Sequence, residues 1–407
     1  MEEVITRRKI KFVMLIGASL HKYGSSSDRI EKALLLLSEK LKLDSQFFST
    51  PTSLLACFKI DDEREFTRLR RLDVGKVNLK KLLLVDQVVD KIIDDSLSVE
   101  NAMKSIYSIL NESPLYKGLI VDLAYAIVSF NICVFIGGTF WDAGFAGICG
   151  FLVGVLTENI KVERLNSIIE GVLAFLVAFT SLVASHYLPI VIHPEVTTIA
   201  ALIILIPGLM LTTSISELAS NNLTSGTARL LGAIMILLKI TFGVYLAQLL
   251  ARSFNLDATV FLPVQHSIFY SALLMTLTAV GFVISYQARF KEYYWICAGC
   301  VLTFLCSKYT SLYLGFAMSA FISGAFIAAF SNFFSRISKK PSLITLLPGI
   351  TLLVPGSIGY SGIESMINQQ TVEGIDTILK TFLIAVALVS GTFFGSILVK
   401  PRRSLDI

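Results

Sequence analysis

Two short stretches decide the fold of this chain: Leu205-Ile206-Pro207-Gly208 and, 148 residues later, Leu353-Val354-Pro355-Gly356. The same offset pairs further glycines, Gly226 with Gly374 and Gly243 with Gly391. It also carries the five apolar stretches of the first half onto those of the second half with almost no gaps. A repeated motif alone is a weak signal, but its agreement with every apolar stretch predicts an internal duplication.

Composition separates a charged N-terminal segment from a long apolar one. Of the 407 residues, 54% are hydrophobic and 16% are charged, whereas about a quarter are charged in soluble chains. The first 117 residues hold 20 Lys and Arg with 17 Asp and Glu, and the remaining 290 hold only 15 and 13. The net charge of +5 is shared by both segments, so it gives no indication of nucleic-acid binding.

Ten apolar segments are long enough to cross about 30 Å of hydrocarbon. They are Gly118–Gly138, Trp141–Thr157, Ile168–Tyr187, Val196–Thr213, Ala228–Leu250, His266–Tyr286, Tyr293–Ser307, Leu312–Phe334, Leu343–Ser357 and Ile375–Val399. Since five spans is an odd number, the second copy of the duplication is expected to be inverted in the membrane, as in many secondary transporters.

Loop charges orient the spans. With the N-terminal segment inside, the inner loops and tail carry eleven Lys and Arg, Lys161, Arg164 and Arg403 among them. Only three lie outside: Arg252, Lys308 and Lys380. The outer stretch Gly356–Asp376 carries no Lys or Arg at all and is expected to be an outer loop. We therefore predict a mostly α polytopic membrane protein with ten transmembrane helices in two inverted five-helix repeats, preceded by a small cytosolic α+β domain. The predicted domains are 1–115, 116–255 and 256–407, in a cell (inner or plasma) membrane with both termini cytoplasmic.

The N-terminal domain is predicted to contain four helices and three strands. In chain order they are Arg7–Tyr23, a helix from Asp28 to about Leu43, the strands Ser45–Thr50, Thr52–Ile60 and Arg64–Leu72, and the helices Asn78–Asp95 and Ser98–Asn111. Asp28 and Glu31 form a capping-box pattern. Gly24-Ser25-Ser26-Ser27 could hold a phosphate at a helix N-terminus, but no GK[ST] follows, and a structural, regulatory or assembly role is favoured over catalysis. No cleavage site follows the apolar run Ile10–Ala18, so a signal peptide is not expected.

Three Pro-Gly pairs predict where a substrate binds. Pro207-Gly208 is expected in the cytoplasmic half of the fourth span, Pro355-Gly356 in the outer half of the ninth, and Pro348-Gly349 nearer its middle. Proline removes a backbone donor and glycine permits non-helical backbone, and in lipid the freed groups must face protein or water. Interrupted helices at corresponding positions therefore indicate a central binding site; ordinary kinks are the alternative.

Two polar residues within the spans are further candidates for substrate binding. Lys239 lies about ten residues into the fifth span. A charged side chain at that depth is costly to bury in a membrane, so a functional role is the default hypothesis. It could meet a substrate carboxylate or pair with an acid, and a structural ion pair is the alternative. Asn131, in the first span, could hydrogen-bond substrate or join two helices.

Three acidic residues are candidates for proton coupling or gating: Glu217, Glu170 and Asp122. Solvated or capping roles are the alternative for each. The Cys297-Ala298-Gly299-Cys300 spacing is better explained by small residues in helix packing than by a metal site. No metal, cofactor or catalytic residue is predicted.

The chain resembles the threonine/serine exporter family over nearly its whole length. The resemblance is carried by Arg29-Ile30-Glu31, Thr50-Pro51-Thr52, Val77-Asn78-Leu79, Gly137-Gly138, Leu205-Ile206-Pro207-Gly208, Glu217-Leu218, Ser225-Gly226-Thr227-Ala228-Arg229, Leu347-Pro348-Gly349 and Leu353-Val354-Pro355-Gly356. It implies export of a small metabolite, threonine or serine, driven by protons across a lipid bilayer. A dicarboxylate such as succinate is the close alternative, and a membrane-embedded enzyme, a channel or an assembly platform are alternatives of other classes. The sequence leaves open whether the protein forms a homo-oligomer.

Overall fold

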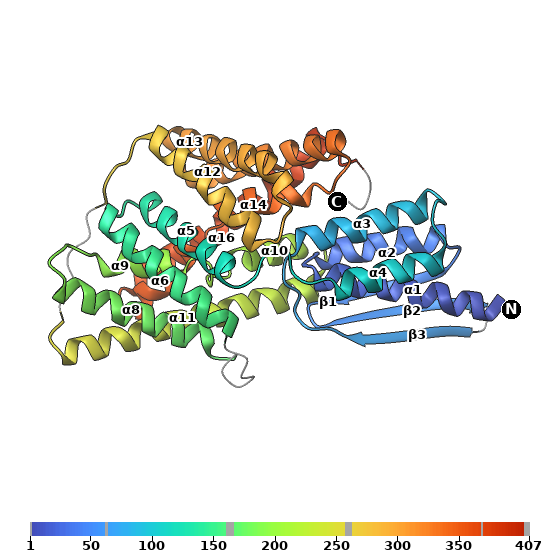
Figure 1. The fold of residues 1–407 in the computed structure, drawn as a ribbon, viewed down its shortest axis with the longest axis horizontal. Coiled ribbons are helices and arrows are strands. Elements are labelled where there is room, and N and C mark those ends of the chain that lie inside the picture. The colour runs from blue at the N-terminus through green and yellow to red at the C-terminus, as the bar shows by residue number, and fades with distance from the viewer. Residues whose placement is uncertain (1, 62–63, 160–166, 257–262, 368, 403–407) are drawn as a thin grey trace.

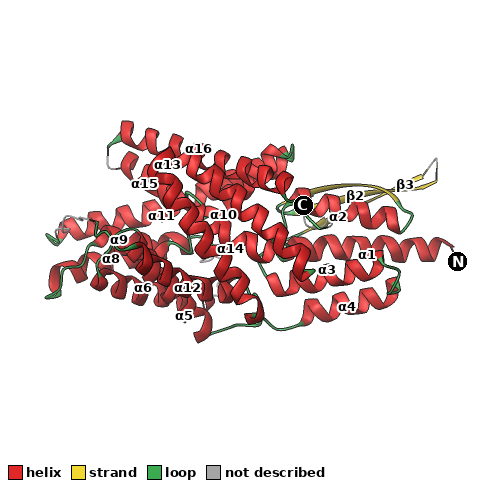
Figure 2. Ribbon diagram, turned by 90° about the horizontal axis from the view of Figure 1, so that it is seen from above, coloured by secondary structure: helices red, strands yellow, loops and turns green. Residues whose placement is uncertain are grey.

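A computed structural model describes residues 2–61, 64–159, 167–256, 263–367 and 369–402. The N-terminal part extends from one end of a larger helical part (Figure 1). Figure 2 shows that strands occur only in the N-terminal part of the described chain. The predicted inner-side cations Lys161, Arg164 and Arg403 lie outside the described residues.

The N-terminal part packs four helices beside a three-stranded antiparallel sheet of order β1-β2-β3. Its elements are α1 (Glu2–Lys22), α2 (Ser27–Lys40), β1 (Asp44–Thr50), β2 (Ser53–Asp61), β3 (Arg64–Arg71), α3 (Leu79–Ile93) and α4 (Val99–Asn111). Helices α1 and α2 contact the sheet, and α3 and α4 pack on α1. Alternation along β2 turns Leu54, Ala56 and Phe58 into the core. This part of the prediction is confirmed in order and type.

One local prediction for this part is wrong. Asp28 and Glu31 do not cap α2: the helix begins at Ser27, its N-cap Ser26 makes no side-chain cap bond, and Glu31 accepts a hydrogen bond from the Ser49 amide of β1 at 2.7 Å. The carboxylate joins a helix to a strand because tertiary packing brings β1 within its reach. The N-caps of the later helices are Asn78 and Ser98, each bonded to a backbone amide three residues on.

The helical part is long and apolar enough to be a membrane domain. Its helices are α5 (Leu119–Phe135), α6 (Phe140–Asn159), α8 (Ile169–Tyr187), α9 (Pro194–Leu202), α10 (Gly208–Ala219), α11 (Leu223–Ser253), α12 (Ile268–Ser285), α13 (Tyr293–Ser338), α14 (Leu343–Leu353), α15 (Gly356–Ile367) and α16 (Thr371–Leu398). Among the described residues, seven helical segments meet the length and hydropathy needed to cross a bilayer, and α5 is a shorter apolar helix.

Two predicted spans, the fourth and the ninth, differ from the helices observed. The fourth is two helices, α9 and α10, because the chain leaves helical geometry before Gly208. The predicted seventh and eighth spans are both present within α13: the chain turns back at Gly315 (φ 76°, ψ 172°), a conformation that glycine tolerates, and the rings of Trp295 and Phe334 lie 5.3 Å apart. The ninth ends at Leu353, and Gly356–Ile367, expected to lie in an outer loop, forms α15. The polar side chains of α15 pack against helices that are distant in the chain, and local sequence signals do not reveal such partners.

The 148-residue offset also relates the packing of the two halves. Helices α10 and α15 are both twelve residues long and begin 148 residues apart. Gly226 lies against Leu218 and Gly374 against Met366, positions again separated by the offset. Gly243 packs on the backbone of α8 and Gly391 on that of α13. Corresponding glycines thus permit corresponding close helix contacts, as an internal duplication predicts.

Candidate functional site: a polar cavity and two helix breaks

The two Pro-Gly breaks meet at the centre of the helical part. A Cβ atom on Gly356 would lie 2.8 Å from Cγ2 of Ile206 and 3.1 Å from Cα of Gly208. A Cβ atom on Gly208 would lie 2.5 Å from Cγ1 of Val354. The contact is reciprocal, because each glycine packs on the residue two positions before the other. Glycine lets the two backbones touch, so the breaks lie at one level in the molecule.

Each break starts a new helix at this contact. Pro207 is the N-cap of α10, with φ −78° and ψ 46°, and α15 begins at Gly356 after the extended Val354 (φ −68°, ψ 128°). The first amide groups of a helix lack intrahelical acceptors and carry partial positive charge. Two positive helix ends therefore converge on one point in the interior.

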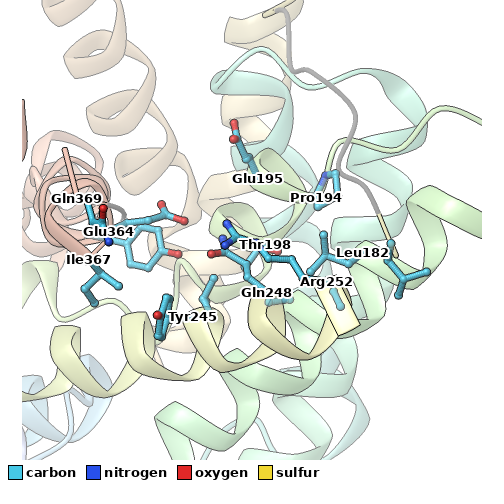
Figure 3. Close-up of a pocket in the computed structure, with 15 residues that line it drawn as sticks. Leu182, Pro194, Glu195, Thr198, Tyr245, Gln248, Arg252, Glu364, Ile367 and Gln369 are labelled. Carbon is cyan, nitrogen blue, oxygen red and sulfur yellow. The ribbon is translucent and has the colours of Figure 1, made fainter. Parts of the chain in front are cut away.

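A cavity of about 560 Å³ is reached one helical turn along α15 from Gly356, at Tyr360, although neither Pro-Gly pair lines it. Helices α8, α9, α11 and α15 contribute its lining, shown in Figure 3. The polar lining residues are Glu195, Thr198, Tyr245, Gln248, Arg252, Tyr360, Glu364 and Gln369. Figure 1 shows α8, α9 and the end of α11 at the side of the molecule away from the N-terminal part, so the cavity lies at that end.

Helix α15 delivers its polar groups to the cavity directly from the break. Tyr360 and Glu364 follow Gly356 at spacings of four residues, which places all three on one helix face. Glu364 lies close to Tyr360 and to Gln248 of α11, and Figure 3 shows Glu364 directed toward Gln248. Tyr360 is 1% exposed. A shift of α15 at its glycine hinge would therefore move the carboxylate and change its partners.

Charges of both signs line this cavity. Glu364 of α15 and Glu195 of α9 are acidic, and Arg252 in the last turn of α11 is basic. A guanidinium binds carboxylates through parallel hydrogen bonds, and carboxylates accept hydrogen bonds from an ammonium group. The cavity thus offers complementary groups for a small molecule that carries both charges.

A buried hydrogen-bonded pair positions α9, which carries Glu195. Asp142 of α6 is fully buried, and its carboxylate accepts hydrogen bonds from the backbone amide of His193 (2.7 Å) and from the Thr139 amide and hydroxyl. His193 Nδ1 lies 2.8 Å from Asp142 Oδ2. Because His193 is the N-cap of α9, these bonds hold the start of that helix against α6.

The structure brings Lys239 and Glu170 together, away from this cavity. Lys239 Nζ of α11 lies 3.3 Å from Glu170 Oε2 of α8, and the two side chains are 29% and 21% exposed. Neither residue lines the cavity. The pair joins two tightly packed helices, as the alternative interpretation of Lys239 expected.

Asn131 and Asp122 lie on α5. The Asn131 amide donates to the Leu274 carbonyl (3.2 Å) and the Thr278 hydroxyl (3.1 Å) of α12, so it joins two helices. Asp122 is 4% exposed, and its Oδ1 has no hydrogen-bond partner among the described residues. Neither residue lines the cavity.

The remaining predicted residues are placed as follows. Pro348 lies inside α14, and Gly349 packs on Ile327 of α13. Glu217 of α10 is fully buried against the N-terminal part. Within the described part of the chain, no group of three or more His, Cys, Asp or Glu side chains could hold a metal ion.

Sequence reasoning located the breaks but missed the polar groups beside them. Glu364 was overlooked because α15 was expected to be a loop, and Arg252 was treated only as an outer-loop charge. One signal was present in the sequence: Tyr360 and Glu364 follow Gly356 at helical spacing. Gln248 and Glu195 come from helices that only the fold brings to α15.

Family models account for nearly all of this chain. A model described as "Putative threonine/serine exporter" matches residues 11–251, and one described as "Threonine/Serine exporter, ThrE" matches residues 271–398. No solved structure gives a significant match.

Curated relatives of this chain include fungal proteins. An uncharacterised protein of Schizosaccharomyces pombe is 23% identical over 87% of this chain and 44% of its own length. Pheromone-regulated membrane protein 10 is 26% identical in Kluyveromyces lactis, over 97% of this chain and 44% of the relative, and 24% in Eremothecium gossypii, over 96% and 56%. The chain spans about half the length of these relatives. With both family models matched in order, this membrane protein belongs to the threonine/serine exporter family.

Proposed function

We propose that this protein is a secondary transporter that exports a small polar metabolite through the cavity lined by α8, α9, α11 and α15. The observation that carries the proposal is the position of Glu364, on a helix that starts at the Gly208–Gly356 contact and in a cavity that also holds Arg252. Binding groups carried on an interrupted helix are typical of secondary transporters, and α15 carries Glu364 two turns after its break.

Ten membrane segments in two inverted repeats remain our proposed architecture, with the domains 1–115, 116–255 and 256–407. Cross-packing between the halves supports it, because α10 contacts α16 while α15 contacts α11. An apolar groove of about 420 Å³ supports it too. Its lining includes the pairs Leu211 and Gly359, Ile215 and Ile363, Leu230 and Ile378, Ile234 and Phe382, and Leu237 and Ala385, each 148 residues apart. Such pairing is expected where a local twofold axis relates two repeats.

The proposed substrate is an amino acid such as threonine or serine. Arg252 would bind its carboxylate, while Glu195 and Glu364 would bind its ammonium group. A dicarboxylate such as succinate is the second candidate, favoured by the converging N-termini of α10 and α15. It fits less well, because two carboxylates of the protein line the same cavity.

Glu364 is also our proposed site of proton coupling, because a proton on its carboxylate would remove the charge that binds an ammonium group. The earlier candidates Glu170, Asp122 and Glu217 lie outside the cavity lining. With the N-terminal part in the cytoplasm, the cavity would lie toward the outer side of a cell membrane. Both termini would then be cytoplasmic.

Reconstitution into proteoliposomes tests this function. Labelled threonine, serine and succinate are offered with and without a proton gradient, and counterflow is measured to separate carrier from channel. We expect threonine or serine to exchange and a proton gradient to drive net movement. If no labelled compound moves under any gradient, the transport proposal fails; if only succinate moves, the dicarboxylate takes its place.

A further inference from the structure

Glu217 attaches the N-terminal part to the interrupted helix α10. Its side chain is fully buried, and one oxygen accepts a hydrogen bond of 2.9 Å from the backbone amide of Ser27, the first residue of α2. The other oxygen accepts from the Ser225 hydroxyl at 2.9 Å. The anion held at the serine-rich start of α2 is therefore a carboxylate of the protein itself, 190 residues away.

Charge and packing complete this attachment. Arg229 Nε lies 2.9 Å from Glu217 Oε2, and the hydroxyls of Ser27 and Ser225 lie 2.7 Å apart. Ser27 is fully buried and Ser225 is 2% exposed. Ser225 and Arg229 both belong to α11, so only Ser27 comes from the N-terminal part.

A second attachment joins the N-terminal part to the other half of the membrane domain. The first amides of α3, Leu79 and Lys80, donate to the carbonyls of Tyr286 and Gln287 just after α12, at 2.9 and 3.1 Å. The Gln287 side chain accepts from the amides of Leu115 and Tyr116. Free donors of one helix start thereby satisfy free acceptors of another helix end.

The two attachments differ in what remains when they separate. If Ser27 withdraws, Glu217 keeps its bonds to Ser225 and Arg229 within its own half, so no charge is left unpaired. If α3 withdraws, the carbonyls after α12 and the amides of Leu79 and Lys80 all lose their partners. The Glu217 attachment is therefore the one suited to opening repeatedly.

We propose that the N-terminal part is a clamp across the two halves of the transporter, and that its contact at Glu217 must open in every transport cycle. This inference rests on the proposed transport function. Helix α10 begins at the Gly208–Gly356 contact and reaches Glu217 about two turns later. A clamp on its far end restrains motion at that hinge while Ser27 stays bound.

A reversible disulfide tests whether the contact must open. Ser27→Cys with Ser225→Cys is made in a background without the six native cysteines, and transport is measured before and after reduction. We expect oxidation to lower the initial rate by about tenfold or more and reduction to restore it, because a trapped conformational step limits turnover. If the oxidised protein transports at the parent rate, the clamp is overturned, because that is the result expected for a purely structural contact.

A matched disulfide controls for oxidation itself. Thr67→Cys beside the native Cys57, retained for this variant, joins β2 to β3 inside the N-terminal part, where the two side chains already lie 3.7 Å apart. Oxidation of this pair is expected to leave transport unchanged. The single variants Ser27→Cys and Ser225→Cys are expected to be insensitive to oxidant.

Thiol labelling tests the clamp without any substrate. The lone cysteine of Ser27→Cys is buried while the contact is closed, so its reaction with a maleimide measures opening. Adding Glu217→Gln weakens the bond to the Ser27 amide and is expected to speed labelling by about tenfold, as expected for loss of a charge-assisted hydrogen bond. Unchanged labelling overturns the clamp, even if the transported compound proves to be another one. If the reduced protein does not transport but its labelling still responds to Glu217→Gln, the transport function is rejected and the opening of the Ser27–Glu217 contact is retained.

Discussion

Gly208 and Gly356 touch across the centre of the protein although 148 residues separate them, with the Cα atom of Gly208 3.1 Å from where a Cβ atom of Gly356 would stand. This contact joins the two halves at the start of α10 and α15. Any side chain there must displace Ile206 or Val354. The hinge of the proposed transport cycle is therefore a contact that only glycine permits.

Gly208→Ala is expected to destabilise the protein by about 1–3 kcal/mol, because the added methyl group overpacks a closed site. Thermal unfolding in detergent measures the loss. Since the methyl group would meet Cγ1 of Val354 at 2.5 Å, Val354→Ala in the same chain should recover part of it. Gly144→Ala on α6 is the control, because nothing lies within 4 Å of its Cβ position. Additive effects of the two substitutions would contradict the contact.

Glu364→Gln is expected to lower transport by about tenfold or more while leaving protein yield unchanged, because it removes a charge from the proposed binding site. Counterflow and gradient-driven uptake are measured side by side. Loss of gradient-driven uptake with counterflow retained would identify Glu364 as the coupling group. Glu373→Gln makes the same change on the exposed first turn of α16 and should behave as the parent; equal loss in both variants would exclude a specific role.

Lys239→Met is expected to cost about 1–2 kcal/mol of stability, less than a fully buried pair because both side chains are partly exposed. The loss arises from the carboxylate of Glu170, left without its partner at 3.3 Å. Adding Glu170→Gln should restore the stability, and the double variant should then transport like the parent protein. Failure of the double variant to transport, at parent-like stability, would return Lys239 to the substrate pathway.

His21 is expected to make the folded N-terminal part sensitive to acid. Burial, then the positive charge of Arg229, lowers the pKa of His21 below its ordinary 6.5, against smaller opposing effects that include Glu217. A histidine whose folded pKa is depressed binds its proton better in the unfolded chain, so stability is complete above the unfolded pKa and falls as pH drops below about 6.5.

The measurement is thermal unfolding against pH for the parent and His21→Gln. The variant should show a smaller loss of melting temperature between about pH 7 and pH 5, the range in which an ordinary histidine takes up its proton. Parallel curves for the two proteins would mean that His21 contributes nothing to the acid response. Substitution of the distant His186, near the end of α8, serves as the control.

Local signals explain why so much of the fold was predictable. Strand alternation and the caps Asn78 and Ser98 depend on neighbouring residues, and the N-terminal elements followed them. Boundaries failed where a distant partner intervened. Glu31 was predicted to cap its own helix but bonds to Ser49. Helix α15 was predicted to be a loop, and the sequence could not show otherwise, because the residues around its polar side chains lie on α9 and α11.

The sequence by itself determined that this is a membrane protein, where its helices break, and that the breaks recur at a constant offset. Those features are encoded in apolar runs, in proline and glycine, and in residue spacing, all of which act locally. Only the tertiary structure decided that Gly208 meets Gly356, that Glu364 reaches Gln248, and that Glu217 binds Ser27. Such pairings depend on how helices cross, because a crossing places side chains together without leaving any periodic trace in the chain.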